Sequence, residues 1–561
     1  MPISRIRVVN FRSIKAIDES ISPICALIGP NNAGKSNILR SIQRVLEKDW
    51  LTRNSFTEED VYGRDPDKDI EITLELDPPY EYQRFKEAEP VDISSIYFEF
   101  TRYKIGPNAG ERRLEQKCFG PEGDAPVVLA KAPKKGERRK FETLYSTPKE
   151  VRENNPLIYI GSNRTLRSQL PGSRYSVLRQ LFESIDQNLQ DPENKIKVKR
   201  IGGEEIEVTR LERFHRLMQE AMKVLRTDQF NELERTIKVN ALKLLGFDPV
   251  EDEEKLNLFF SPFDTFEFYK SLDLQIGEGE MSISATEVGD GLQNAIIMAM
   301  LQALESHKKK GAIFLIEEPE MFLHPQMQRS LYKTLRELGK TNQVIYTTHS
   351  PHFVAIPEYD EVILVRKDQE GTSLRRSDLD NNDVRREKLI KEFDPERNEM
   401  FFATRLLLVE GDTEKLAFPE YANRLGFDVD RAGATIVEVG GKRNLVEFAK
   451  IASSFKIPTG IVYDKDSSEF KDDRESENEY NAKLDSFKTA DGVNEVWRFD
   501  KNFEDELRNA MGEETYQAYC QRFPNTRKPT RARLIALDKD SQIPEIFQEI
   551  VNWLVKKPVD E

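Results

Sequence analysis

Ile24-Cys-Ala-Leu-Ile-Gly-Pro-Asn-Asn-Ala-Gly-Lys-Ser36 is the stretch that decides the fold of the N-terminal part of this chain. Its apolar start predicts a buried strand, and Gly29 to Ser36 fits the pattern G-x-x-x-x-G-K-[ST] in full. In such a loop the backbone N–H groups surround phosphates, the lysine reaches the β- and γ-phosphates, and the serine hydroxyl ligates Mg²⁺. The residues expected at a nucleotide are Gly29, Asn32, Gly34, Lys35 and Ser36, with Ser36 also on the metal.

An amphipathic helix is predicted directly after this loop, because apolar residues recur at helical spacing over residues 38–46. The partial positive charge of its N-terminus would lie beneath the phosphates. Farther along, Ala312-Ile-Phe-Leu-Ile316 predicts a second buried strand, which ends in Glu317 and Glu318. In an ATPase of this kind the first acid orients the Mg²⁺ shell and the second activates the attacking water.

Two further segments fit a nucleotide site. A third strand, predicted over Gln343–Thr348, ends at His349, whose place at the end of a strand suits a residue that senses the γ-phosphate. The glycine-rich residues 286–294 precede an apolar helix that we expect to run through Leu304. Alone, these glycines indicate a phosphate-contacting loop only weakly.

Together these motifs resemble the ATP-binding-cassette (ABC) ATPases of the SMC and RecF type, and the opening Arg7-Val-Val-Asn-Phe-Arg-Ser13 is similar to their first strand and turn. The resemblance implies a head that dimerises around ATP, with the P-loop of one subunit facing the signature loop of the other. It assigns Glu317 and Glu318 to the paired acids, although the first is Glu where Asp is usual. His349 matches the switch histidine. The signature-loop residues are Gly289, Gly291 and Gln293.

The middle of the chain has strand-like patterns over residues 69–76, 96–103 and 157–160. A mainly helical pattern follows from about 174 to 245, with interruptions near Pro192 and Gly202. Its apolar face comprises Leu211, Phe214, Leu217, Ala221 and Leu225. This helical insertion, about residues 170–250, either packs on its own ATPase or acts as a dimerisation arm, and the sequence leaves both open.

Two acidic clusters mark the C-terminal part. Leu406-Leu-Leu-Val409 is followed by Glu410 and Glu414, and Ile461-Val-Tyr463 is followed by Asp464 and Asp466. Each cluster comes where an apolar run stops, which predicts that both lie at the carboxyl edge of a parallel sheet. Converging carboxylates repel each other unless a cation holds them, and hard oxygen ligands suit Mg²⁺ or Mn²⁺.

The alternation of strands, helices and acids after the polar linker at residues 375–398 resembles the Toprim domain of topoisomerases, primases and some nucleases, with Gly440 and Gly441 at its glycine turn. An ABC-type head at residues 1–390 followed by a Toprim domain at 395–561 resembles the OLD (overcoming lysogenisation defect) nuclease family, which includes the nuclease subunit of the Gabija anti-phage system. The expected fold class is therefore α/β, an ATPase head with a helical insertion and a Toprim domain with a central parallel sheet.

The family resemblance implies a two-metal site that cleaves or nicks DNA. One ion would lie on Glu410, Asp464 and Asp466, and the second on Glu414, Asp466 or Glu504. Lys528 is weakly matched to a late basic residue that stabilises charge. The residues expected to take part in chemistry are Glu410, Asp464, Asp466, Lys528 and, for ATP, Glu318.

The leading hypothesis is an ATP-regulated, Mg²⁺- or Mn²⁺-dependent DNA endonuclease in anti-phage defence. It would act as a homodimer or larger homo-oligomer, alone or with a helicase or a retron-type RNA–DNA partner. The alternative is a recombination or repair ATPase that binds DNA without cutting it. A primase is disfavoured because zinc-ligand cysteines are missing, and a topoisomerase because no nucleophilic tyrosine is identifiable.

Composition restricts the setting. The net charge of −15 argues against a nucleic-acid coat protein, although basic clusters at residues 131–140, 195–200 and 522–533 could each contact DNA locally or lie on solvated loops. No apolar run is long enough to span a membrane, and no signal-peptide pattern opens the chain. The three cysteines are widely spaced, so we expect reduced thiols and a cytoplasmic protein.

Overall fold

The computed structural model describes most of the chain: residues 2–47, 55–132, 139–144, 146–153, 155–162, 166–169, 182, 185–186, 188–199, 205–251, 254, 265, 273–278, 281–307, 311–380, 394–465 and 471–556. The chain forms two compact units. The first combines Met1–Ser162 with Lys310–Glu561, and the second is Asn163–Lys309. The predicted domain boundaries at 390 and 395 fall in or beside residues 381–393, which lie outside the described residues.

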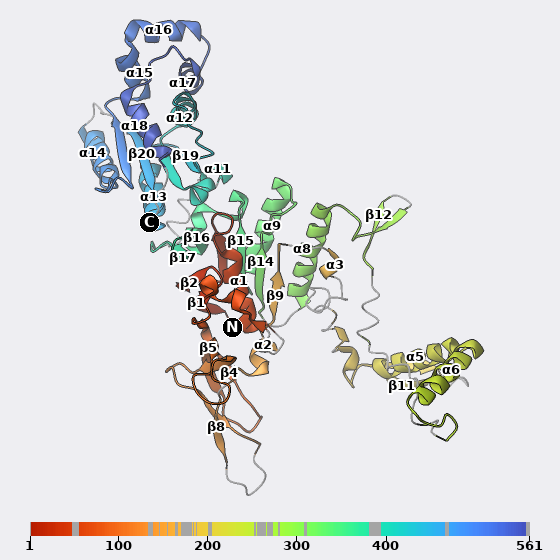
Figure 1. Cartoon of the computed structure of the whole chain (residues 1–561). Helices are drawn as coiled ribbons and strands as arrows, with labels where there is room; N and C mark the ends of the chain where they lie inside the picture. The colour runs from red at the N-terminus through yellow and green to blue at the C-terminus, as the bar shows by residue number, and fades with distance from the viewer. Residues whose placement is uncertain are drawn as a thin grey trace. The chain divides into compact units, whose positions relative to one another are not determined.

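A six-stranded sheet organises the nucleotide-binding part of the first unit (Figure 1). Every residue of β3, β14 and β15 is buried, as expected for a parallel sheet covered on both faces. Only the edge strand β17 runs antiparallel. The strands in spatial order are β17 (Gly371–Arg376), β16 (Val362–Asp368), β3 (Ile24–Ile28), β15 (Gln343–Thr348), β14 (Ile313–Glu317) and β9 (Leu157–Ile160).

A second, antiparallel sheet packs on the other side of the first helix. Helix α1 (Lys35–Leu46) contacts strands of both sheets and buries Ile38, Leu39 and Ile42 in their shared core. The strands in spatial order are β2 (Ile14–Ser20), β1 (Ile3–Phe11), β4 (Ile70–Tyr82), β5 (Val91–Arg102) and β6 (Arg112–Phe119). Smaller elements of this part are β7 (Val127–Leu129), β8 (Phe141–Thr143), α2 (Lys149–Glu153), α9 (Pro325–Leu338) and the 3-10 helices η5 (Pro351–Phe353) and η6 (Ile356–Glu361).

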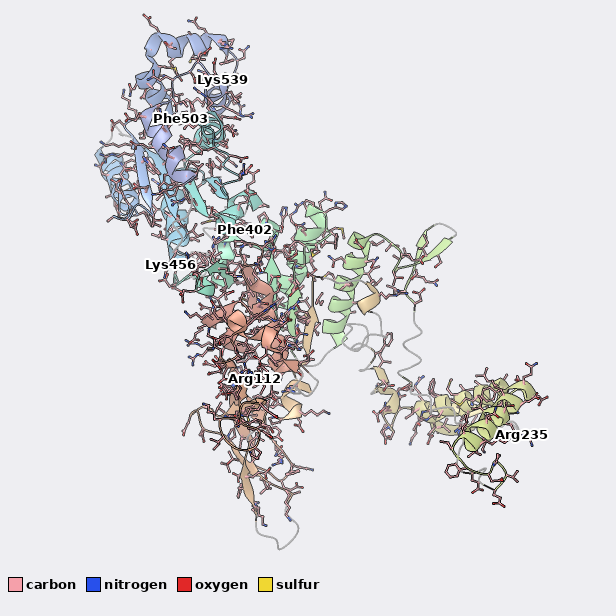
Figure 2. The ribbon with its side chains drawn as sticks, in the orientation of Figure 1. Arg112, Arg235, Phe402, Lys456, Phe503 and Lys539 are labelled. Carbon is pink, nitrogen blue, oxygen red and sulfur yellow. The ribbon has the colours of Figure 1, made fainter. Side chains whose placement is uncertain are left out.

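The C-terminal part of the first unit has its own parallel sheet, drawn in cyan and blue in Figure 1, in the order β19 (Ala434–Glu438), β18 (Arg405–Val409), β20 (Thr459–Asp464) and β21 (Glu495–Phe499). Phe503, labelled in Figure 2, stacks on Phe547 with ring centroids 4.6 Å apart in its core. The helices are α11 (Pro395–Asn398), η8 (Glu399–Phe402), α12 (Asp412–Arg424), α13 (Lys442–Ser454), α14 (Lys471–Asp485), α15 (Phe503–Met511), α16 (Glu513–Arg522), α17 (Lys528–Leu537) and α18 (Glu545–Leu554).

The second unit contains helices and two short strand pairs. Helix α8 (Asp290–His307) follows the glycine-rich loop, as predicted. The other elements are α3 (Leu166–Gln169), α5 (Arg210–Leu225), α6 (Asp228–Leu244), and the pairs β10 (Lys195–Lys199) with β11 (Glu205–Thr209) and β12 (Gln275–Glu278) with β13 (Met281–Ser284).

The helical prediction is wrong for residues 195–199 and 205–209. Lys-Ile-Lys-Val-Lys199 and Glu205-Ile-Glu-Val-Thr both alternate charged or polar with apolar residues, and they pair as antiparallel strands. In this register Lys197 lies opposite Glu207 and Lys199 opposite Glu205. Cross-strand pairs of opposite charge stabilise a sheet. The basic cluster predicted at 195–200 is therefore matched by acidic residues on the neighbouring strand.

The other predicted strands and helices that fall on described residues are confirmed, including the strands at the P-loop, at Glu317 and before His349. Residues 170–181 of the predicted helical insertion and residues 133–138 of the basic cluster at 131–140 lie outside the described residues. The predicted linker begins inside β17 and ends in α11. Within the described residues, no helix is both long enough and apolar enough to cross a membrane. Cys25 and Cys118 are buried, and none of the three cysteines forms a disulfide.

Gly460, in the middle of β20, offers a stability test. A Cβ there would lie 2.8 Å from the Trp553 ring and 3.0 Å from both Trp497 and Leu407. We expect Gly460→Ala to destabilise this domain by about 1–3 kcal/mol through overpacking, seen as an earlier transition in tryptophan fluorescence during urea unfolding. Gly277→Ala is the control, because a Cβ at Gly277 meets no atom within 4 Å. An unchanged transition for Gly460→Ala would contradict the packing described.

Candidate functional site

The P-loop requires glycine at its two ends because the sheet edge lies against it. Gly29 has φ 151° and Gly34 has φ 106°. A Cβ on Gly29 would lie 2.1 Å from the carbonyl oxygen of Val365 on β16, and one on Gly34 would lie 2.2 Å from Thr372 Oγ1 on β17. There is no room for a side chain at either glycine, so the P-loop packs directly against β16 and β17.

Lys35 is held inside the loop. It is 6% exposed, and its Nζ donates to the carbonyl oxygens of Gly29 and Pro30, each at 2.9 Å. Burial lowers the pKa of Lys35 to about 8, while the nearby Glu318 and Glu320 oppose that effect. Asn32 is exposed at the tip of the loop with φ 64°, and Ser36 is half-buried in the first turn of α1. The predicted phosphate-binding residues therefore lie on one loop and one helix N-terminus.

The first acid, Glu317, is tied to the neighbouring strand. It is 3% exposed and ends β14. Its Oε1 accepts a hydrogen bond from Tyr159 Oη at 2.7 Å, and its Oε2 accepts one from the backbone N of Ser162 at 3.1 Å. No sequence motif pointed to Tyr159. The parallel pairing of β9 with β14, which places Tyr159 opposite Leu315, brings its hydroxyl to this carboxylate.

The second acid lies beside the predicted switch histidine. Glu318 adopts φ 44°, and its backbone N donates to Thr347 O at 3.0 Å, which turns the chain at the end of β14. Glu318 Oε1 lies 3.7 Å from His349 Nε2. Burial lowers the pKa of His349, and the positive charge of Lys35 lowers it further. The adjacent order of β3, β15 and β14 explains why Lys35, His349 and Glu318 meet at one edge.

Behind them, Glu320 fixes the turn after β15. Its Oε1 accepts from His349 N at 2.6 Å and from Thr348 Oγ1 at 2.8 Å. Burial raises the pKa of Glu320. The position of His349 is therefore linked to the loop that follows Glu318.

The predicted signature loop belongs to the second unit. Gly289 precedes α8, and a Cβ added there would meet no atom within 4 Å. Gly291 lies in the first turn of α8. Gln293 is engaged locally, because its Nε2 donates to Val288 O at 2.7 Å and its Oε1 accepts from Leu166 N at 3.1 Å. Its side chain shapes the loop around the glycines.

A cavity of about 530 Å³ lies at the turn after β1. Arg12, with φ 54°, donates from Nε to Asp60 Oδ1 at 2.8 Å on its wall. The next residue, Ser13, accepts from Asn37 Nδ2 of α1 at 2.8 Å, which places this turn beside the start of the P-loop helix. The lining residues are Arg12, Thr57, Glu59, Asp60, Val61, Gly63 and Arg64.

The C-terminal acids gather at the carboxyl edge of the second parallel sheet. Glu410 follows β18 and Asp464 ends β20, the adjacent strand. Asp464 N donates to Glu410 Oε1 at 2.9 Å. Gly441, with φ 113°, donates from its backbone N to Glu410 O at 3.0 Å. The glycine turn therefore lies directly against the first acid.

Glu414 and Glu504 come to the same edge from two helices. Glu414 lies in the first turn of α12 and is 7% exposed. Burial raises the pKa of Glu414 to about 7, and the negative charges of Glu410 and Glu504 contribute. Lys528, at the start of α17, has its Nζ 3.6 Å from Glu504 Oε1. We call the set Glu410, Glu414, Asp464 and Glu504 the acidic rim.

The acidic rim fits a hard divalent cation by its chemistry. All its donors are carboxylate oxygens, and Glu414 is held in a buried, negatively charged setting that a cation would relieve. Asp466 lies outside the described residues. Among the residues that are described, no three His, Cys, Asp or Glu side chains lie close enough together to hold an ion.

The basic cluster at 522–533 is partly neutralised. Arg522 Nη1 lies 2.7 Å from Asp538, and Arg533 Nη2 lies 2.8 Å from Glu420. Arg531 donates to Thr526 O at 3.0 Å, which holds the turn before α17. Lys528 is therefore the member of this cluster that faces the acidic rim.

Comparisons with known proteins agree with both halves of this arrangement. Residues 1–200 and 139–354 match the family described as AAA ATPase domain, and residues 401–466 match the Overcoming lysogenization defect protein-like, TOPRIM domain. An OLD nuclease of Thermus scotoductus is 31% identical over 83% of this chain and 82% of its own length. This chain belongs to the OLD nuclease family.

Two more distant relatives extend the family match. The Old nuclease of Escherichia phage P2 is 26% identical over 83% of this chain and 77% of its own length. The endonuclease GajA of Bacillus cereus (strain VD045) is 23% identical over 79% of this chain and 71% of its own length. The ABC-type ATPase head and the Toprim domain expected from the sequence are thus both present in this OLD-family chain.

Tyr159→Phe tests the contact that holds Glu317. A hydrogen bond to a charged group contributes about 1.5–3 kcal/mol, so we expect ATP hydrolysis with Mg²⁺ to slow about tenfold or more. ATP binding, measured with a fluorescent analogue, should change little. Tyr80→Phe is the control, because it removes a hydroxyl on β4 that donates to Glu150 O of α2, away from the P-loop. Unchanged hydrolysis in Tyr159→Phe would show that this hydroxyl does not orient Glu317.

Proposed function

We propose that this chain is an endonuclease that cleaves DNA phosphodiesters with divalent metal ions and under the control of ATP. The observation that carries the proposal is the acidic rim, where Glu410 and Asp464 from adjacent parallel strands meet Glu414 from α12. The same compact unit contains a complete P-loop, which a nuclease does not need for cleavage alone. Membership of the OLD nuclease family supports the combination.

Mg²⁺ or Mn²⁺ bound at the acidic rim supplies an activated water on one side of the phosphodiester and stabilises the leaving oxygen on the other. Glu410, Asp464 and Asp466 would hold one ion, and Glu414, Glu504 or Asp466 would supply ligands to the second. Lys528, 3.6 Å from Glu504, neutralises charge at the edge of this set and can stabilise a phosphate oxygen.

Gly29, Asn32, Gly34 and Lys35 of the P-loop would surround the phosphates of ATP, and Ser36 would ligate its Mg²⁺. Glu317, held by Tyr159, orients the ion's water shell, and Glu318 activates the water that attacks the γ-phosphate. His349 senses that phosphate from beside Glu318. The cavity at Arg12 and Asp60 receives the nucleoside end of ATP, because it lies next to the start of α1.

DNA is the substrate in this proposal, and anti-phage defence is the biological role, as the family resemblance implies. Lys528, in the first turn of α17, has its Nζ 3.6 Å from Glu504 Oε1, and Arg527 directly precedes it. Contacts of this kind to the phosphate backbone make binding weaken as salt rises. A helicase or a retron-type RNA–DNA partner would add a trigger to the same chain.

Asp464→Ala and Lys35→Ala separate the two sites. We expect Asp464→Ala to abolish nicking of supercoiled plasmid with Mn²⁺ or Mg²⁺ while ATP binding is retained, because Asp464 meets Glu410 at the rim. Lys35→Ala should keep nicking but lose its response to ATP, since Lys35 is confined to the P-loop. EDTA should stop nicking in every active variant.

Glu549→Ala, on the exposed side of α18, is the matched control and should behave as the wild type. Nicking that survives Asp464→Ala or EDTA would end the metal-nuclease assignment. Nicking by the wild type that ignores ATP would end only the regulatory part.

The chain acts as a homodimer in this proposal, with the helical insertion as its dimerisation arm. Helix α5 begins with a capping box at Thr209 and Glu212, yet it buries none of its residues. Val224 is 78% exposed and Leu225 is 61% exposed. The neighbouring α6 exposes Leu233 and Ile237 in the same manner. Apolar surface of this extent on two consecutive helices is typical of an interface with another chain.

Val224→Glu tests the arm. It places a charge in the apolar surface, and we expect the dimer to dissociate at least about tenfold more readily, because burying an unpaired charge is costly. Sedimentation at a series of concentrations measures this. Gln219→Glu adds the same charge at an exposed position on roughly the opposite side of α5 and should leave the dimer intact. Equal sedimentation of both variants would argue against the apolar surface of α5 and α6 as the dimer interface.

A further inference from the structure

The short helix α11 touches three different elements through three consecutive residues. It begins with Pro395 and is capped by Asp394, whose side chain accepts from Glu396 N at 2.9 Å. It lies where the chain enters the Toprim domain, directly before η8 and β18. Glu396, Arg397 and Asn398 each contact a separate part of the first unit, so α11 connects parts that are distant in the sequence.

Asn398 contacts the segment that follows the switch histidine. Its side chain is fully buried, and Nδ2 donates to Pro351 O at 3.0 Å and to Val354 O at 2.6 Å. These two carbonyl groups lie at the start of η5 and just after its end. Because η5 begins only two residues after His349, Asn398 is bound to the chain that leaves the nucleotide site.

Arg397 contacts the glycine turn of the acidic rim. Its Nε donates to Glu438 O at 2.9 Å, and its Nη2 pairs with Glu438 Oε2 at 3.1 Å. A Cβ on Gly440 would lie 3.3 Å from Arg397 Nη2, so the guanidinium packs against the turn itself. The next residue, Gly441, donates to Glu410 O. Arg397 therefore packs against Gly440, which directly precedes the residue whose backbone N–H binds Glu410.

Glu396 adds a contact on the other side of the rim. It forms an ion pair with Lys415 on α12, the residue next to Glu414. Thus Arg397 contacts β19 and Glu396 contacts α12, both next to the acidic rim. Asn398 contacts the backbone at both ends of η5. All three contacts therefore meet on one four-residue helix.

We propose that Arg397 and Asn398 are positioning residues that couple the segment after His349 to the acidic rim, so that the nucleotide state sets the placement of Glu410. The proposal rests on the ATP regulation proposed above and names the contacts that carry it. A ligand shifts a protein only through its different affinities for two states. A γ-phosphate that attracts His349 changes the course of η5, and α11 passes this change to the turn at Gly440 and Gly441.

The alternative is that α11 merely joins the two domains. Other contacts do this without touching either site. Arg366 Nη2 donates to Ala403 O at 2.8 Å. Arg375 Nη1 donates at 2.9 Å to the backbone O of Lys456, which is labelled in Figure 2. Arg375→Ala therefore removes a contact of the same junction but leaves the proposed coupling intact, which makes it the matched control.

The experiment measures nicking of supercoiled plasmid with Mn²⁺ across a series of ATP concentrations. We expect Asn398→Ser to reduce the ATP response, the ratio of rates without and with saturating ATP, to within about twofold of one. Its rate without ATP and its affinity for a fluorescent ATP analogue should remain near wild-type values. Arg375→Ala should keep the full response. A full response in Asn398→Ser would overturn the proposal.

Arg397→Gln approaches the coupling from the rim and does not depend on a buried asparagine, so it keeps the test decisive if Asn398→Ser fails to fold. It should also lose the ATP response, and a retained response overturns the proposal. The His349→Ala/Asn398→Ser double variant should be no worse than either single variant, because the two residues act in series. Additive losses would place them on independent routes. If ATP does not change the nicking rate of the wild type, the proposed ATP regulation itself is wrong. If ATP changes the rate of the wild type and of both variants equally, only the coupling through α11 is wrong.

Discussion

The parallel pairing of β3 with β15 and β16 is the constraint on which both candidate sites depend. β3 delivers the P-loop, β15 delivers His349, and β16 with β17 forms the surface that the loop packs against. The close approach of Gly29 to Val365 leaves the loop little freedom. β16 and β17 also carry Arg366 and Arg375, which hold the Toprim domain. One sheet therefore sets the nucleotide site and anchors the domain that bears the acidic rim.

Electrostatic repulsion shapes the acidic rim as strongly as packing does. Glu414 is buried beside two other carboxylates, and the result is a pKa of about 7, far from that of an exposed glutamate. The surrounding structure provides backbone N–H groups for Glu410 through Asp464, and a lysine for Glu504. These contacts offset part of the repulsion.

The predictive power of the sequence was greatest where a motif is local. The P-loop, the strand ending in Glu317, the strand before His349 and the two acidic strand ends were all located correctly, because each needs only an apolar run followed by a few polar residues. The helix prediction is wrong for residues 195–199 and 205–209, which pair as antiparallel strands. Pairing with a second strand decided that region, and pairing is not visible in either run alone.

The sequence by itself determined the family, the order of the two domains and the residue types proposed to bind phosphate and metal. The tertiary structure decided which residues support them. Tyr159 and Glu317 are 158 positions apart, and Asn398 lies 44 positions from Val354. Glu317 stands where aspartate is usual. Only the fold shows that Tyr159 and Ser162 donate hydrogen bonds to its carboxylate. The physical reason is that a hydrogen bond between distant segments depends on strand order and register, which arise when the whole sheet assembles.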